Sequence, residues 1–320
     1  MTRTRKTGLG LTLALVSALV FGTSGAFAKG LLDAGWTPAA AVTARAIIAA
    51  LLLAIPAAVA LRGRWRLLVT GWRTVLLFGV VAVGVTQLAY FQAVQYVSVG
   101  VALLLEYLGV LLVVLWLWAR HGQRPRPLTI VGGVVALIGL VGVLDVVSGA
   151  TINPLGVIWG LIAAVGLATY FVVSADDRTP IPPVALAAAG MLTGAITLGL
   201  VGALRILPMR VTTEDVLLAG RAVPWWALVL ALGLISTAIA YSTGIGAARA
   251  LGSKVASFVG LTEVLFAVLI AWLLLGQLPR PLQLVGGALI LVGVVAVKAD
   301  ERSRVSKVAV EPEPPIADPA

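Results

Sequence analysis

Long apolar runs, separated by short polar or basic stretches, dominate this chain. Each run is close to the roughly 20 residues that a helix needs to cross a bilayer. The two-residue alternation expected of a membrane-spanning barrel is missing, so helices satisfy the backbone hydrogen bonds. The pattern predicts ten transmembrane helices, at about 8–28, 39–61, 74–96, 98–119, 128–147, 155–175, 182–204, 224–247, 253–275 and 281–297.

The first apolar run imitates a secretory signal peptide. A basic stretch, Arg3–Lys6, precedes it, and Ala26–Ala28 resembles a cleavage site. The run is nevertheless long enough to span a membrane, and its removal would leave the first half of the chain one helix short. We therefore expect it to be the first transmembrane helix.

One stretch of the chain occurs twice. Residues 122–143 and 276–297 agree at 13 of 22 positions, and both contain GQxPRPL followed by VGG. Chance produces similar apolar runs but not this polar, proline-containing stretch, so the chain is a duplicated unit. Each copy holds five predicted helices, and because five is odd the second copy enters the membrane from the opposite side. Such inverted-topology repeats are typical of secondary transporters.

The duplication sets the expected domain boundaries. We predict a first five-helix repeat over residues 1–148 and a second over residues 149–298. The remaining segment, 299–320, is charged and rich in proline, which predicts a disordered cytoplasmic tail. The fold class is therefore an all-α integral membrane protein, with ten transmembrane helices arranged as a 5+5 inverted repeat.

Composition supports a lipid environment. Hydrophobic residues make up 60% of the chain and charged residues 11%, against about 25% charged residues in soluble domains. The chain has no cysteine and a single histidine, His121, so we expect no cofactor, disulfide or zinc site. The net charge of +10 does not indicate nucleic-acid binding, because the basic residues lie in short loops between apolar runs.

The basic residues also predict the topology. With the N-terminus in the cytoplasm, 17 of the 23 lysines and arginines fall in cytoplasmic segments, 5 in external segments and 1 inside a span. Positive charge gathers on the cytoplasmic side of membrane proteins. We therefore expect a multi-pass protein of the cell membrane (inner or plasma membrane), with both termini in the cytoplasm.

Several stretches resemble a known family. They are Phe21–Lys29 (FGTSGAFAK) with Arg45 downstream, Ala240-Tyr241, Leu261–Gln277 (LTEVLFAVLIAWLLLGQ) and Leu103–Val110 (LLLEYLGV). The two copies resemble the paired EamA repeats of the drug/metabolite transporter superfamily, and LLLEYLGV resembles the glutamate-bearing fourth helix of its amino-acid-exporting branch. The resemblance covers about Leu11–Val297. It implies a ten-helix carrier that exports amino acids, other metabolites or toxic compounds.

The chain departs from this family pattern at one kind of residue. Members often carry a proline after the glutamate of the fourth helix and at the matching place of the ninth. Here those places read Glu106-Tyr107-Leu108-Gly109-Val110 and Glu263-Val264. Proline is a common cause of helix kinks. The sequence therefore leaves open whether these helices are kinked and whether such kinks take part in gating.

Two glutamates are the strongest candidates for the chemistry. Glu106 and Glu263 are the acidic residues that fall well inside predicted spans, whereas Asp145 is close to a span end. A charge at the centre of a membrane helix is disfavoured by about 2.5–3.5 kcal/mol on insertion scales, so it usually has a task or a partner. A substrate-amine contact, a proton carrier and a structural hydrogen bond or ion pair all remain open.

Other polar residues could share this site. Arg45 is the basic residue inside a span; it could bind a substrate carboxylate, pair with a glutamate, or be structural. Gln87 and Gln95 lie on one predicted face of the third span, where cavity lining and interhelical hydrogen bonding are both reasonable. The further candidates for substrate or coupling contacts are Tyr90, Tyr107, Tyr170 and Tyr241.

These features favour a secondary transporter that exports a small metabolite, such as an amino acid or a related compound, by alternating access. Its partners would be the substrate, with proton coupling as an option, and the lipid bilayer. A homodimer stays open. The alternatives are a drug or toxic-compound efflux carrier, or a membrane enzyme acting on a lipid or isoprenoid. The enzyme is disfavoured because Asp176-Asp177 has no second acidic cluster.

Overall fold

The computed structural model describes residues 3–97, 99–143, 153–176, 178, 180–218, 220–275, 278 and 280–308. Within these residues, nine helical stretches are long and apolar enough to cross a membrane, and Pro127–Val143 is a shorter apolar helix. The predicted all-α membrane fold is confirmed, with one small addition, a β-hairpin of two three-residue strands. Asp145 lies outside the described residues.

The elements follow the predicted spans, and several spans consist of two or three helical pieces. The first repeat contains α1 (Arg3–Phe21), α2 (Ser24–Asp33), α3 (Pro38–Leu61), α4 (Arg66–Thr70), α5 (Trp72–Leu77), the π-helix η1 (Phe78–Val85), α6 (Thr86–Tyr96), α7 (Val99–Tyr107), α8 (Gly109–His121) and α9 (Pro127–Val143). The second contains α10 (Pro154–Ala175), α11 (Pro183–Ala203), β1 (Val216–Leu218), β2 (Arg221–Val223), α12 (Trp225–Gly233), the π-helix η3 (Leu234–Ile239), α13 (Ala240–Leu251), α14 (Ser253–Gly260), α15 (Thr262–Leu275) and α16 (Pro281–Val308).

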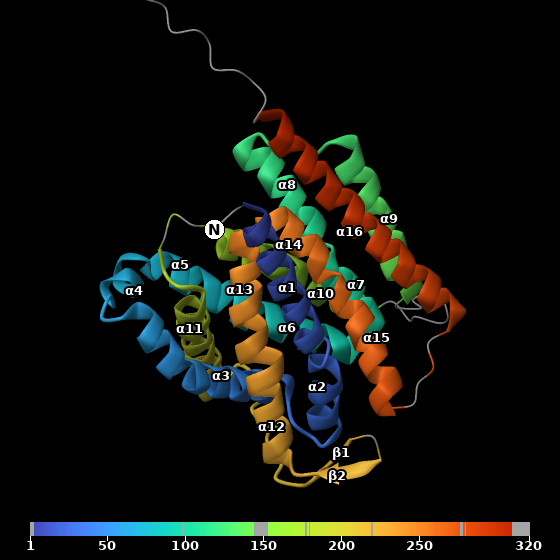
Figure 1. Cartoon of the computed structure of the whole chain (residues 1–320). Coiled ribbons are helices and arrows are strands. Elements are labelled where there is room, and N and C mark those ends of the chain that lie inside the picture. The colour runs from blue at the N-terminus through green and yellow to red at the C-terminus, as the bar shows by residue number, and fades with distance from the viewer. Residues whose placement is uncertain are drawn as a thin grey trace, which may run out of the picture.

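The two repeats pack as symmetric partners (Figure 1). Helix α3 packs against α11, and α9 packs against α16, so each of these helices contacts its own equivalent in the other repeat. Helix α1 packs against α13, and the equivalent pair, α10 and α6, packs in the same way. This exchange of partners is what a pseudo-two-fold axis between inverted repeats produces.

Glycines of the duplicated stretch lie at the contact between α9 and α16. A Cβ atom added to Gly139 would lie 2.5 Å from the carbonyl oxygen of Gly286, and one added to Gly132 would lie 2.9 Å from that of Gly293. In the sequence repeat Gly132 aligns with Gly286 and Gly139 with Gly293, so the contacts cross between the copies. Glycine is required here because the two backbones approach closely.

The fourth and ninth spans are interrupted although they lack the family's prolines. Leu108 separates α7 from α8, and Leu261 separates α14 from α15. At both places the backbone makes short i→i−3 hydrogen bonds, from Leu108 to Leu105 at 3.2 Å and from Leu261 to Phe258 at 3.1 Å. The question that the sequence left open is thus answered for the helix breaks: both spans are interrupted. Tightened turns produce the interruptions without help from proline.

The third and eighth spans each contain a π-helical segment, η1 and η3. In each span a threonine hydroxyl donates a hydrogen bond to the carbonyl five residues earlier, from Thr86 to Val81 and from Thr237 to Leu232, both at 2.7 Å. Wider turns of this kind are frequent at functional sites. Gln87 and Tyr241 each follow one of these segments directly in the chain.

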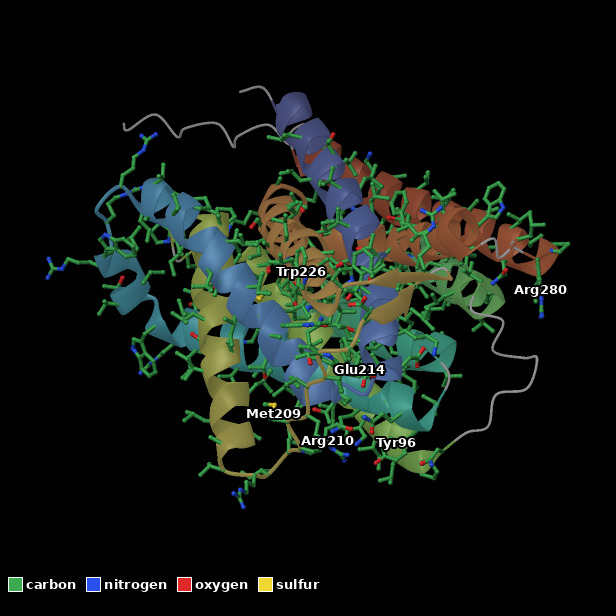
Figure 2. All side chains as sticks on the ribbon, turned by 90° about the horizontal axis from the view of Figure 1, so that it is seen from below. Tyr96, Met209, Arg210, Glu214, Trp226 and Arg280 are labelled. Carbon is green, nitrogen blue, oxygen red and sulfur yellow. The ribbon has the colours of Figure 1, made fainter. Side chains whose placement is uncertain are left out.

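The long loop between α11 and α12 is fixed to the first repeat. The indole nitrogen of Trp36 donates to the carbonyl of Thr212 at 3.0 Å, and the Thr212 hydroxyl donates to the carbonyl of Ala34 at 2.8 Å. The backbone nitrogen of Thr37 donates to the carbonyl of Arg210 at 3.0 Å. Figure 2 views the molecule from below, which is the side of this loop. In that view Arg210 and Glu214 lie near the middle from left to right, and Arg280 lies at the edge. The loop therefore ties together the ends of both repeats.

The last helix is longer than the sequence predicted. Helix α16 continues to Val308, so residues 299–308 are helical, where a disordered tail was expected from residue 299. Asp300 explains part of this extension, because its buried carboxylate accepts a 2.5 Å hydrogen bond from the Thr129 hydroxyl and lies 3.8 Å from Arg126 Nη1. The rest of the expected tail, 309–320, lies outside the described residues.

Candidate functional site

A cavity of about 450 Å³ lies between the two repeats. Its wall is built from α1, α2, α6, α7, α10, α13, α14 and α15 together with the end of η1. A volume of this size falls in the range of about 300–1,000 Å³ that small-molecule sites occupy. Seven of the nine residues expected at a site line it: Gln87, Tyr90, Glu106, Tyr107, Tyr170, Tyr241 and Glu263.

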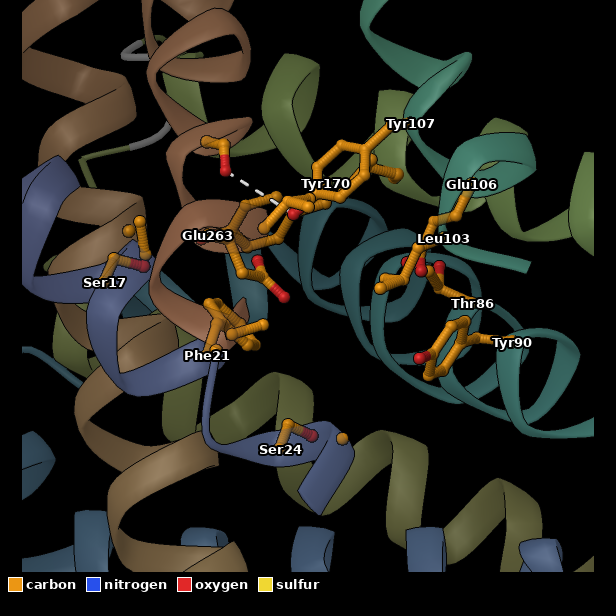
Figure 3. A pocket seen from close by; sticks show the side chains of 18 of the residues that line it. Ser17, Phe21, Ser24, Thr86, Tyr90, Leu103, Glu106, Tyr107, Tyr170 and Glu263 are labelled. Carbon is orange, nitrogen blue, oxygen red and sulfur yellow. Dashed lines mark hydrogen bonds between the residues drawn. The ribbon is translucent and has the colours of Figure 1, made fainter. Parts of the chain in front are cut away.

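The two glutamates come from equivalent spans of the two repeats. Glu106 is in the last turn of α7 and Glu263 in the first turn of α15, each within two residues of the interruption in its span. Figure 3 shows them on opposite sides of the view into the cavity. The symmetry is therefore approximate: one carboxylate precedes its helix break, and the other follows it.

The surroundings of the two carboxylates differ. Glu106 is 8% exposed, and within the described part of the chain its carboxyl group has no hydrogen bond or salt bridge. Glu263 is only partly buried. The nearby cavity-lining Tyr107 donates its hydroxyl proton to the carbonyl of Gly260 at 3.5 Å. A buried carboxylate without a partner is costly, because it has lost its hydration. Glu106 is therefore the acid whose desolvation cost a bound ligand or proton would reduce most.

Arg45 lies behind the cavity wall and does not line it. Its side chain is 1% exposed, and its guanidinium makes four hydrogen bonds. Nε donates to Thr237 Oγ1 at 2.8 Å, Nη1 to Ser24 Oγ at 3.1 Å and to Gln87 Oε1 at 2.9 Å, and Nη2 to the carbonyl of Ser236 at 3.0 Å. Of the three roles left open, the structure agrees with the structural one. The guanidinium thereby connects Ser24, beside the break between α1 and α2, to Ser236 and Thr237 of η3.

Gln87 connects Arg45 to the cavity. Its amide oxygen accepts from Arg45, and its Nε2 donates to the hydroxyl of Tyr241 at 3.2 Å. The orientation of this amide follows from its two partners, since the oxygen faces a donor and the nitrogen an acceptor. The interhelical hydrogen bonding and the cavity lining expected of the third span are thus combined in one residue.

Gln95 does not line the cavity. Its side chain is exposed near the end of α6, two turns beyond Gln87. The prediction of a common face is wrong at this residue. Because four residues rotate the helix about 40° beyond a full turn, eight residues move a side chain about 80° around the axis. That rotation is enough to leave the cavity.

Aromatic rings form a continuous cluster at the cavity wall. The ring centroid of Tyr241 lies 5.1 Å from that of Phe21 and 5.4 Å from that of Tyr170, both in edge-to-face geometry. Tyr170 is 5% exposed, and its hydroxyl is a buried polar group without a partner in the described residues. The cavity wall thus contains a cluster of aromatic side chains, and the Tyr170 hydroxyl is packed within the protein beside Gly244.

Sequence reasoning did not single out several lining residues, among them Ser17, Ser24, Lys29 and Thr86. Serine and threonine are common in membrane helices and carry no mark of a site. A signal did exist for two of them, because Ser24 and Lys29 belong to the FGTSGAFAK stretch that resembles the family. The break between α1 and α2, at Gly22-Thr23, turns this stretch toward the cavity.

The acidic residues of the described chain do not form a metal centre. Within that part no group of three or more His, Cys, Asp or Glu side chains comes together. Of the acidic pair noted for a membrane enzyme, at 176–177, Asp176 Oδ1 lies 3.8 Å from Arg178 Nε on the surface, and Asp177 is outside the described residues.

Comparison with known proteins adds an independent line of evidence. A family model described as the EamA-like transporter family matches residues 8–145 and 154–298. An uncharacterized transporter of Archaeoglobus fulgidus is 29% identical over 211 residues, which are 66% of this chain and 71% of the relative. A chain solved by crystallography superposes with a TM-score of 0.72 at 22% identity, covering 94% of this chain and all of that chain. At that identity the superposition supports the fold alone.

Proposed function

The chain belongs to the EamA-like transporter family, and we propose that it is a secondary transporter that exports a small amine-containing metabolite, such as an amino acid or a related compound. The observation that carries this proposal is the buried carboxylate of Glu106, which has no hydrogen-bond or salt-bridge partner among the described residues and lies in a cavity between inverted repeats. Ionisable groups inside membrane proteins usually mark a substrate or proton pathway.

Alternating access is the mechanism that the architecture favours. Both repeats contribute helices to the cavity wall, so a rocking motion of one repeat against the other would change which end of the cavity is open. The spans that carry Glu106 and Glu263 are interrupted next to these residues, which gives each span two segments that can reorient. The axis of this rocking motion would pass through the close glycine contact between α9 and α16.

Glu106 has two roles within this mechanism. Its carboxylate would bind the ammonium group of the substrate, and it would take up a proton when the substrate leaves. Either occupant removes the free energy cost of an unpaired buried charge. The empty, charged state would therefore be short-lived, and export would be coupled to proton entry through the same carboxyl group.

Purified protein in liposomes provides the test. We expect the wild-type protein to catalyse counterflow of labelled metabolites from a pooled cell extract, with a rate that depends on pH. Glu106→Gln should abolish this movement or remove its pH dependence. Glu214→Gln, which changes an exposed glutamate in the loop before β1, is the matched control and should behave as wild type.

Two results would count against the proposal. If no solute of the pool moves faster than in protein-free liposomes, the protein is not a transporter of this kind. If Glu106→Gln still shows full, pH-dependent flux, Glu106 has no part in binding or coupling.

A further inference from the structure

The charges that face the cavity are unbalanced. Its lining holds two acidic residues, Glu106 and Glu263, and one basic residue, Lys29. Lys29 already pairs with Asp33, with 2.9 Å between Nζ and Oδ2, and both side chains are more than 60% exposed. The lysine therefore belongs to the solvent-exposed rim. Inside the cavity the acidic and basic side chains of the described lining are therefore the two carboxyl groups.

The other nearby cation is not available to a ligand. Arg45 is almost fully buried behind the wall, and four hydrogen bonds to neutral groups hold its guanidinium. A ligand carboxylate could reach it only by breaking the bonds to Gln87 and Ser24. The described lining thus contains no buried cation that could neutralise a ligand carboxylate, and an unneutralised buried carboxylate is strongly disfavoured.

Helix dipoles add to the preference for a cationic over an anionic ligand at Glu106. The residue lies in the last turn of α7, where the helix end carries partial negative charge. Glu263 instead lies in the first turn of α15, where it complements the positive end of that helix. At the start of α15 the carboxylate of Glu263 therefore occupies the place where a ligand anion could have bound. At the end of α7 the helix dipole adds negative potential at Glu106.

The rest of the wall suits a cation with an apolar body. The aromatic side chains of Phe21, Tyr170 and Tyr241 line the cavity, and aromatic faces attract ammonium groups. Aromatic rings and carboxyl groups together match one kind of ligand.

We propose that the cavity binds a small monovalent organic cation, a protonated amine on an aromatic body that carries no carboxylate. The ammonium group would lie at Glu106 and the ring against Phe21, Tyr170 and Tyr241. This inference rests on the proposed transport function and narrows its substrate class from amine-containing metabolites in general to those without an acid group.

Three matched compounds test the inference: phenethylamine, phenylalanine and 3-phenylpropionate. They share one aromatic body and carry an amine, both groups and an acid, respectively. Their binding to the purified full-length protein is measured by calorimetry, and each is then tested in liposome counterflow. We expect phenethylamine to bind at least about tenfold more tightly than phenylalanine, since the added carboxylate is buried without a counter-charge. Phenylpropionate should not bind.

Variants connect the preference to named residues. Glu106→Gln should weaken phenethylamine binding at least about tenfold, because it removes the buried counter-charge. Tyr170→Leu removes one of the aromatic rings that line the cavity, so it should weaken phenethylamine binding by a smaller factor. Glu214→Gln, at an exposed residue outside the cavity, should leave phenethylamine binding unchanged.

The outcomes separate the two proposals. Tighter binding of phenylalanine, lost in Lys29→Gln, would overturn the inference and leave the transporter intact. Absence of phenethylamine binding to a correctly folded protein would overturn the inference as well. Absence of flux for every solute, with phenethylamine still bound at Glu106, would overturn the transport function and retain the binding site.

Discussion

Nε of Arg45 donates a 2.8 Å hydrogen bond to Oγ1 of Thr237, and this bond joins the two repeats. Arg45 belongs to α3 of the first repeat and Thr237 to η3 of the second. Thr237 in turn donates to the carbonyl of Leu232, inside the widened turn of the eighth span. The guanidinium thus stabilises a local departure from α-helical geometry next to the cavity.

Arg45→Lys is predicted to destabilise the protein. An ammonium group cannot reproduce the planar fork that reaches Ser24, Gln87 and Thr237 together. Loss of one hydrogen bond to a charged group costs about 1.5–3 kcal/mol, so the thermal midpoint in detergent, followed by tryptophan fluorescence, should fall by several degrees.

Arg66→Lys is the matched control for this measurement, since Arg66 is an exposed arginine at the start of α4. Its midpoint should stay at the wild-type value. An unchanged midpoint in Arg45→Lys would show that the network around Arg45 does not hold the repeats together.

The contact between Gly139 and Gly286 predicts that no side chain larger than that of glycine is tolerated at position 139. A Cβ atom at Gly139 would lie 2.5 Å from the Gly286 oxygen and 2.7 Å from the backbone nitrogen of Ile290. Neither backbone atom can move without shifting a helix, so Gly139→Ala should separate α9 from α16. Overpacking of this kind costs about 1–3 kcal/mol, and it should appear as a lower thermal midpoint.

Gly199→Ala serves as the comparison, because no atom lies within 4 Å of a Cβ built at Gly199 in α11. That variant should be neutral or more stable, since alanine favours a helix over glycine by about 1 kcal/mol. Equal stability of the two variants would contradict the close approach of α9 and α16.

The sequence alone predicts the architecture, because the lengths of the apolar runs and the duplication each depend on many residues and not on a single one. The crossed contacts of Gly132 with Gly293 and of Gly139 with Gly286 are the structural counterpart of the repeated VGG stretch. The intramembrane glutamates were also visible in the sequence, because a carboxylate in an apolar run stands out.

The finer features of the site were not visible because they depend on local geometry. Arg45 could be placed in a span, but whether its guanidinium meets a glutamate or an amide depends on how neighbouring helices rotate. The π-helical turns of η1 and η3 shift that rotation, and no period in the sequence indicates them. Gln95 was misplaced for a related reason, since small angular errors accumulate over two helical turns.

Two ion pairs of similar appearance are predicted to differ in their effect on stability. Asp300 is 6% exposed and receives a hydrogen bond from Thr129, whereas the Lys29–Asp33 pair is exposed at both ends. Asp300→Ala should lower the free energy of unfolding by about 1.5–3 kcal/mol through the lost charged hydrogen bond. Asp33→Ala should change it by about 1 kcal/mol or less, as expected of a surface pair.

Chemical denaturation of the two variants in one detergent makes this comparison. If Asp300→Ala unfolds together with wild type, the contact between α16 and the start of α9 does not contribute to stability, and the helical extension to Val308 has another cause.

The orientation of the chain in the membrane can be tested with single cysteines, because the natural sequence contains none. The charge bias of 17 basic residues against 5 predicts that the hairpin side faces out and that the basic loop at α4 faces the cytoplasm. In intact cells, Arg221→Cys should therefore react with a membrane-impermeant maleimide, and Arg66→Cys should react only after lysis. Both residues are exposed, so a difference in labelling reports sidedness and not burial. The opposite pattern would show that the chain is inserted with its hairpin side in the cytoplasm.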